Sequence, residues 1–132
     1  MIKNKDIMLK IGEFPVVKED IFFKEAIEKM SKFNLGILCI TNKKTELVGI
    51  ITDGDLRRML LNIQKPFSAF FVDDVILHAK KNPITSTPEE DVKKTLTKMN
   101  SFKVWDIPIL KKNKLVGLVH LHPAVENLIS RL

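Results

Sequence analysis

The sequence predicts an α/β (α+β) fold built from two copies of one β-α-β-β-α unit. The first supporting observation is an internal repeat: the shift that places Asp6 on Asp74 also places Leu47–Gly49 on Leu115–Gly117. The second is that each copy contains an apolar pattern with helical spacing, followed by two short apolar runs typical of a β-hairpin. We therefore expect one domain over residues 1–66 and a second over residues 67–132.

The first copy is expected to contain an extended stretch, a helix, two strands and a closing helix. The first helix is predicted because Phe23, Ala26 and Met30 recur at three- and four-residue spacing. The strands are short apolar runs on either side of a polar turn. The expected bounds are Phe14–Val17, Ile21–Phe33, Leu35–Thr41, Leu47–Thr52 and Asp55–Leu61.

The second copy is expected to repeat this order. Its first helix is predicted to follow Thr87, which is a candidate N-cap, and Pro88 suits the first helical position. The acidic residues that come next, Glu89–Asp91, suit the positive end of the helix dipole. The other expected bounds are Asn82–Thr85, Ile107–Leu110, Leu115–His120 and Ala124–Leu132.

Composition indicates a compact protein. The 132 residues are 45% hydrophobic, yet half of that length makes only a marginal core, so we expect the two sheets to bury each other around a pseudo-two-fold axis. No apolar run is long enough for a membrane span, and the N-terminus is too charged for a signal peptide. We therefore expect a cytoplasmic protein without membrane contact. The single Cys39, between apolar neighbours, is expected to be a buried thiol.

The formal net charge of +6 favours anionic partners, which leaves nucleic acid, an acidic protein or a small phosphorylated ligand. The lysines are scattered and do not alternate with aromatic residues, so we do not expect nucleic acid. Trp105 is expected to be a buried strand residue. His120 and His122 have too few other potential ligands in the sequence to predict a metal site. No nucleophile-and-base arrangement of an enzyme is visible either.

The stretch LVGIITDGDLRRML, from Leu47 to Leu60, carries the clearest chemistry. A strand ending at Thr52 is followed by a helix, whose free N–H groups and dipole favour an anion. The Thr52 hydroxyl and Arg57 or Arg58 can bind a phosphate, whereas the Asp55 carboxylate can accept both hydroxyls of a ribose. A second interpretation stays open: Thr52 and Asp53 cap the helix, and Asp55 stabilises its dipole.

Several motifs resemble a pair of cystathionine β-synthase (CBS) domains, a Bateman module. They are DIM followed by a proline, LVGIITDGDL and LVGLVHL, and the resemblance covers about Asp6 to Leu128. NLGILCI, GIITDGDLRRML and GLVHLH are similar to the CBS pair of arabinose 5-phosphate isomerases of the Kdo pathway. TDGDLRR and KNPIT also resemble CBS pairs that precede sugar-nucleotide transferases. The remaining residues are too few for a sugar-isomerase domain, so isomerase activity is not implied.

The resemblance implies a nucleotide site in the cleft between the motifs. It implies that Thr52 holds phosphate and that Asp55 holds ribose. In the second copy, His120 stands at the threonine position and Pro123 at the aspartate position, so we expect one site per chain, although His120 remains able to contact a phosphate. The resemblance also implies that five residues surround the base and so form the base side of the site: Val16, Val17, Leu35, Gly36 and Ile37. The expected ligand-binding residues are these five together with Thr52, Asp53, Asp55, Arg58 and His120.

The expected function is therefore that of a regulatory nucleotide sensor and not of an enzyme. It would bind an adenosine nucleotide (AMP, ADP or ATP) or a CMP-sugar, require no cofactor, form a homodimer and modulate a client enzyme of sugar-nucleotide or cell-surface polysaccharide metabolism. The leading alternative is a ligand-free CBS scaffold that holds an oligomer together. The Met1 start leads us to expect a free-standing protein or an N-terminal piece.

Overall fold

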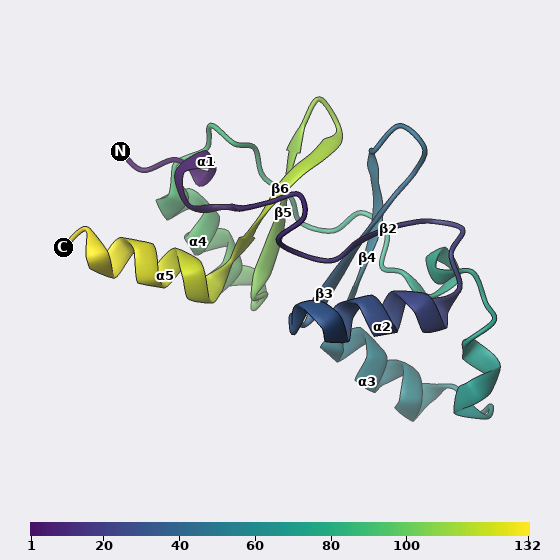
Figure 1. Cartoon of the computed structure of the whole chain (residues 1–132). Coiled ribbons are helices and arrows are strands. Elements are labelled where there is room, and N and C mark those ends of the chain that lie inside the picture. Colours follow the sequence, from purple (N-terminus) through teal and green to yellow (C-terminus); the bar gives the residue numbers. More distant parts are fainter. The chain divides into compact units, whose positions relative to one another are not determined.

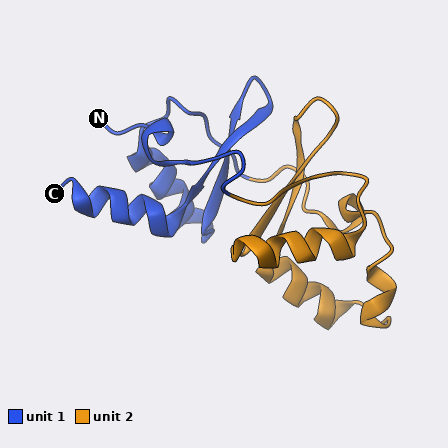
Figure 2. Cartoon of the chain, in the orientation of Figure 1, with its two compact units in different colours: residues 1–13, 84–132 blue, residues 14–83 orange.

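The computed structural model describes residues 1–132, which form two compact units (Figure 2). Unit 1 comprises residues 1–13 and 84–132, and unit 2 comprises residues 14–83. Each unit has its own three-stranded sheet, as the predicted α/β fold requires. The units differ from the halves expected at 1–66 and 67–132, because the N-terminal residues pair with a strand of the second half and the segment after residue 66 packs on the first half.

Unit 2 contains the sheet β2-β3-β4 (Figure 1). Strand β2 (Val16–Lys18) runs parallel to β3 (Ile37–Thr41), which pairs with β4 (Leu47–Thr52) in an antiparallel hairpin. The helices are α2 (Phe23–Phe33) and α3 (Asp53–Asn62), which lie side by side in Figure 1. The bounds of β4 are as the sequence predicts, and α3 begins two residues earlier than expected because Thr52 is its N-cap.

The core of unit 2 follows from the helical spacing of α2. Phe23, Ala26 and Met30 are buried on one face of this helix, against Leu38 and other strand residues. Burial of the Phe23 and Met30 side chains stabilises the fold by about 1.5–3 kcal/mol each. Phe70, which follows α3, is buried in the same core, and Cys39 is buried as expected.

The chain leaves unit 2 through a connector, defined here as residues 64–83. It contains two short 3₁₀ helices, η1 (Phe67–Phe70) and η2 (Val75–His78). After η2, Lys80 forms a single antiparallel bridge with Ile50 on β4. This bridge lies on the edge of β4 that does not pair with β3.

Unit 1 contains the sheet β1-β6-β5. Strand β5 (Asp106–Lys111) pairs with β6 (Lys114–His120) in the predicted hairpin, and β1 (Leu9–Lys10) adds to the other edge of β6. Val92, Met99, Ile107, Ile109 and Val119 form the core, together with Ile7 and Ala124. Its helices are α1 (Asn4–Ile7), α4 (Val92–Phe102) and α5 (Leu121–Ser130).

Helix α4 begins at Val92, so the prediction that it starts after Thr87 is wrong. Its N-cap is Asp91, whose carboxylate accepts a hydrogen bond from Lys93 N–H at 3.0 Å. The preceding carbonyl groups are instead bonded to the N-terminal segment: Pro88 accepts from Lys5 N–H and Glu90 from Asn4 N–H, both at 3.0 Å. These tertiary hydrogen bonds hold residues 88–90 in a non-helical conformation.

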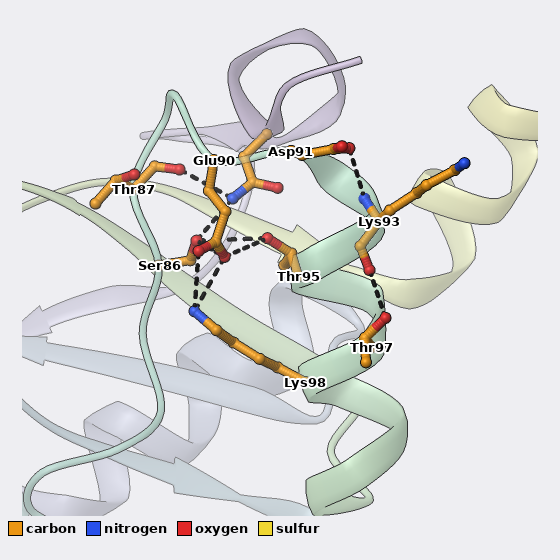
Figure 3. Close-up of polar contacts among 9 residues, drawn as sticks. Ser86, Thr87, Glu90, Asp91, Lys93, Thr95, Thr97 and Lys98 are labelled. Atoms are coloured by element: carbon orange, nitrogen blue, oxygen red, sulfur yellow. Dashed lines mark hydrogen bonds and ion pairs between the residues drawn. The ribbon is translucent and has the colours of Figure 1, made fainter. Parts of the chain in front are cut away.

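A polar network in unit 1 joins the segment before α4 to α1 and α4 (Figure 3). Glu90 Oε1 accepts hydrogen bonds from Ser86 Oγ at 2.6 Å, Thr95 Oγ1 at 3.0 Å and Lys98 Nζ at 3.0 Å. Asn4 Nδ2 donates to Ser86 Oγ at 2.9 Å. Burial raises the pKa of Glu90, but the hydrogen bonds outweigh it and hold this pKa below its ordinary value. The network thus fastens α1 to residues far along the chain.

Trp105 is 69% exposed, so the prediction of a buried strand tryptophan is wrong. It lies just before β5, at the point where its backbone carbonyl receives a hydrogen bond from Leu121 N–H at 3.0 Å. The backbone of Trp105 is therefore fixed while its indole ring faces solvent.

None of the helices combines the length and the apolar character that a bilayer-spanning segment needs.

Candidate functional site

Thr52 and Asp55 form a capping box at the start of α3. Thr52 N–H donates to Asp55 Oδ2 at 2.9 Å, and Asp55 N–H donates to Thr52 Oγ1 at 3.2 Å. The backbone permits this because Thr52 is still extended as the last residue of β4. Two orphan N–H groups are satisfied in this way. Thr52 therefore caps α3 as the second interpretation expects, but its partner is Asp55 and not Asp53, and any ligand role of Thr52 and Asp55 must coexist with this cap.

Arg58 lies over the first turn of the same helix. Its Nη2 atom is 2.8 Å from Asp55 Oδ1. A Cβ atom on Gly54 would come within 3.2 Å of the guanidinium group, so the glycine at this position makes room for the arginine. Burial raises the pKa of Asp55, but hydrogen bonds from Arg58 and Thr52 hold this pKa below its ordinary value. The Asp55 carboxylate is thus charged at neutral pH.

Three donors at the N-terminus of α3 stay available to an anion. The Thr52 hydroxyl accepts one hydrogen bond but can still donate its own proton. Gly54 N–H belongs to the first helical turn, where no intrahelical acceptor exists. The Arg58 side chain is 56% exposed and uses one of its nitrogens on Asp55. Such a set, placed at the positive end of a helix dipole, suits a phosphate group.

Asp55 and Arg58 open onto a cleft of about 380 Å³ within unit 2. One wall is α3, and the other is the end of the connector. Besides Asp55 and Arg58, the lining residues are Met59, Asn62, Ile63, Leu77, His78, Ala79 and Lys80. The cleft has room beside the Asp55 carboxylate for part of a small ligand, even though this carboxylate is paired with an arginine.

Leu35, Gly36 and Asp53 lie together at a second depression of about 250 Å³, between α2 and α3. Asp53 N–H donates to the Gly36 carbonyl at 3.0 Å, and its Oδ2 lies 2.6 Å from where a Cβ on Gly36 would be. Asp53 and Asp55 are two residues apart on α3 and so project from different sides of the helix. The structure therefore brings Leu35 and Gly36, two of the residues expected around the base, to one depression with Asp53, and it places Asp53 away from Asp55.

The other expected base-side residues lie behind this surface. Val17 and Ile37 are 6% and 1% exposed, so they are buried in the sheet and offer almost no surface to a ligand. Val16 is half-buried, and its carbonyl accepts a hydrogen bond from Lys29 Nζ at 2.8 Å. Lys29 on α2 was not a candidate from the sequence, because a lone exposed lysine carries no specific signal.

His120 belongs to unit 1 and has a different partner. It is the N-cap residue of α5 but makes no side-chain capping bond; its Nδ1 instead lies 2.6 Å from Asp106 Oδ1. Leu121 N–H donates to the Trp105 carbonyl as Asp53 N–H donates to Gly36, so the two copies share this backbone bond. The second copy therefore keeps the turn and has a His120–Asp106 side-chain contact in place of the capping box.

Sequence reasoning missed the connector wall of the cleft, above all His78 and Lys80. One signal pointed to it. Gly49 in β4 has no side chain, and a Cβ there would lie 2.9 Å from Ala79 Cβ and 3.2 Å from the Lys80 carbonyl. A glycine inside a strand indicates close approach of another backbone, which here is the connector.

Comparison with known proteins identifies the family. The profile of the CBS domain matches residues 5–62. The uncharacterized protein YlbB of Bacillus subtilis is 32% identical over 122 residues, which cover 92% of this chain and 78% of YlbB. This chain belongs to the CBS domain family. Its two repeated units make it a CBS domain pair, as the sequence motifs predict.

A longer relative is the arabinose 5-phosphate isomerase KdsD of Francisella tularensis, which is 29% identical over 131 residues. The match covers 96% of this CBS pair but 37% of KdsD, so the chain spans little more than a third of that relative.

Two solved structures share the fold of the CBS pair. CBSX2 in complex with AMP has a TM-score of 0.86 and 19% identity, covering 99% of this chain and 98% of CBSX2. The CBS domain pair of MJ0100, in complex with 5′-methylthioadenosine and S-adenosyl-L-methionine, has a TM-score of 0.81 and 24% identity; the match covers 100% of this chain and 99% of that one. Adenosine-containing ligands therefore occur in CBS pairs of this fold.

Proposed function

We propose that this CBS pair is a regulatory module that senses an adenosine nucleotide (AMP, ADP or ATP) and has no catalytic role of its own. The observation that carries the proposal is the start of α3, where the Thr52 hydroxyl, Gly54 N–H and the Arg58 guanidinium all belong to the cap and first turns of one helix. Asp55 stands beside them and faces a cleft. The adenosine ligands of CBSX2 and MJ0100 support the choice of ligand class.

The capping box is compatible with this ligand. Thr52 Oγ1 accepts from Asp55 N–H and can donate to a phosphate at the same time. Each oxygen of the Asp55 carboxylate accepts one recorded hydrogen bond and has a further lone pair for a ribose hydroxyl. Ligand binding therefore adds contacts to the box without opening α3.

The base is proposed to lie toward Leu35 and Gly36, with Ile37, Val16 and Val17 behind them in the sheet. Support comes from the depression of about 250 Å³ that Leu35 and Gly36 line. Adenine and cytosine are both flat rings that such a surface accommodates, so a CMP-sugar is the second ligand to test. The similarity to KdsD, a sugar-phosphate enzyme by name, favours including it.

The test is the ligand-induced rise in melting temperature, measured with AMP, ADP, ATP and a CMP-sugar at millimolar concentration. Asp55→Ala is expected to abolish the rise. This variant also loses a helix cap, so the matched control is Asp91→Ala, which removes the cap of α4 in unit 1 and leaves the site intact. Both variants should melt earlier than wild type, but only Asp91→Ala should keep the nucleotide response. No response from wild type would refute the sensor.

A ligand-free scaffold is the second candidate, and the closed capping box favours it. Thr52 and Asp55 are already satisfied by each other and by Arg58, so their presence needs no ligand to explain it. A scaffold predicts that oligomer mass is the same with and without nucleotide and that none of the panel raises the melting temperature. Sedimentation velocity with and without ATP distinguishes the two functions.

We propose that the module acts as a homodimer that regulates a client enzyme of sugar-phosphate or sugar-nucleotide metabolism. Exposed apolar side chains on α3 (Leu60, Leu61) and α5 (Val125, Ile129) support association through helices. KdsD, an isomerase of a sugar phosphate by name, contains a match to this chain and a longer remainder, which supports a sugar-phosphate enzyme as the client. A monomeric mass at micromolar concentration would contradict the dimer. If the activity of a client isomerase does not change when this module and ATP are added, the proposed partner is wrong.

A further inference from the structure

The connector forms the wall of the cleft that faces α3, and one end of this wall is firmly held. His78 Nε2 lies 2.8 Å from Asp73 Oδ2, and the imidazole packs edge-on against Phe23 and Phe70 at ring-centre distances of 5.0 and 5.4 Å. The side chain of His78 is therefore fixed by an ion pair or hydrogen bond and by aromatic contacts.

The other end of this wall is held by one residue pair. Lys80 N–H donates to the Ile50 carbonyl at 2.8 Å, and Ile50 N–H donates to the Lys80 carbonyl at 3.0 Å. No neighbouring residue of the connector extends this ladder, because the bridge is isolated. A segment held by so few hydrogen bonds at a sheet edge opens at a lower free energy than the core strands do.

The basic side chains around the cleft differ in their contacts. Arg58 is paired with Asp55, and the His78 ring lies against Asp73. Lys80 lines the cleft but has no carboxylate within ion-pair distance, and it is exposed. Lys80 is thus the cation of the connector wall that has no ion-pair partner.

We infer that Lys80 is the second cationic contact of the nucleotide phosphate, and that this contact holds the connector on β4. The inference rests on the proposed function, because it concerns the ligand of the same site. A phosphate placed between Arg58 and Lys80 joins α3 to the connector, which strengthens the bridge to Ile50. The chain enters unit 1 at Ile84, shortly after Lys80. Ligand binding in the cleft therefore restrains the segment that covalently joins the two units.

The experiment compares Lys80→Met with Lys81→Met by calorimetric titration of AMP, ATP and adenosine. Both variants lose one positive charge and keep an apolar stem, but only Lys80 lines the cleft. Lys80→Met is expected to weaken AMP and ATP binding roughly tenfold, as loss of a charge-assisted contact does, and to leave adenosine binding unchanged. Lys81→Met is expected to bind all three ligands as wild type does.

A second readout is amide hydrogen exchange at Lys80, whose N–H forms the bridge to Ile50. Addition of ATP should slow this exchange in wild type and in Lys81→Met, but not in Lys80→Met. If wild type binds none of the three ligands, the proposed function and this inference fall together. If wild type binds AMP or ATP but the two variants bind alike, or ATP leaves exchange at Lys80 unchanged, only the role of Lys80 is wrong.

Discussion

Thr52 and Asp55 hydrogen-bond to each other in both directions, from Thr52 N–H to Asp55 Oδ2 and from Asp55 N–H to Thr52 Oγ1. The same two residues begin α3 and carry the proposed ligand contacts. Loss of nucleotide binding on mutating either one is therefore ambiguous unless helix stability is measured as well. The predictions on this site are designed around that double role.

Thr52→Ala is expected to lower the free energy of unfolding by about 1 kcal/mol, the usual value of a lost N-cap. Thr52→Ser keeps the hydroxyl and should change stability by much less. Urea unfolding followed by circular dichroism measures both. The two variants should also differ in ligand binding, because only Ser retains the proton donor proposed for the phosphate. Equal unfolding midpoints for Ala and Ser would show that the hydroxyl does not cap α3.

Gly36→Ala is expected to destabilise unit 2 by about 1–3 kcal/mol, because the new Cβ would lie 2.6 Å from Asp53 Oδ2. Asp53 is exposed on α3, so its side chain can be removed at little cost. The clash predicts strong coupling: in Gly36→Ala with Asp53→Ala, much of the lost stability should return. A double-mutant cycle of urea unfolding measures it. Additive losses would mean that the backbone, and not the Asp53 carboxylate, limits the space at Gly36.

The regular elements could be predicted from the sequence because their signals are local. The helical spacing of Phe23, Ala26 and Met30 predicts α2, and the apolar run that ends at Thr52 predicts β4. Repetition of the pattern in the second copy supported each assignment. The start of α3 could be placed to within two residues because a threonine followed by an aspartate three residues later is a capping signal as well as a ligand motif.

The features that sequence reasoning missed depend on distant partners. Thr87 and Pro88 read as a helix start, but the carbonyls that follow bind Asn4 and Lys5, which no local pattern reveals. Strand β1 has two residues, too few for an alternation signal. The position of Lys80 at the cleft likewise depends on its pairing with Ile50, thirty residues earlier in the chain.

Glu89 is expected to make the attachment of the N-terminal segment sensitive to acid. Hydrogen bonds from Lys3 and Lys5 lower the pKa of Glu89 from 4.5 to about 2. Because the folded-state pKa is the lower one, the stabilisation is complete above about pH 4.5 and is lost as the pH falls toward about 2. The difference in urea midpoint between wild type and Glu89→Gln should therefore shrink over this range, and also with added salt.

The matched control for this pH dependence is Glu28→Gln, because Glu28 is exposed on α2 and makes no ion pair. Its urea midpoint should follow that of wild type at every pH. The effect of Glu89→Gln should be small even at neutral pH, since both lysines are largely exposed to solvent. A difference from wild type that stays constant between pH 5 and about 2 would contradict the lowered pKa.

Asn4→Ala is expected to destabilise unit 1 by about 2 kcal/mol. Asn4 is fully buried, and its Nδ2 donates to Ser86 Oγ and to the Thr87 carbonyl, both at 2.9 Å. The substitution leaves these acceptors without their donor in a buried setting, where the penalty is largest. The control is Asn100→Ala, which is exposed on α4 and should be neutral or slightly stabilising, because alanine favours the helix. Equal unfolding free energies for the two variants would mean that the buried amide of Asn4 contributes nothing and that the other contacts of α1 hold it in place.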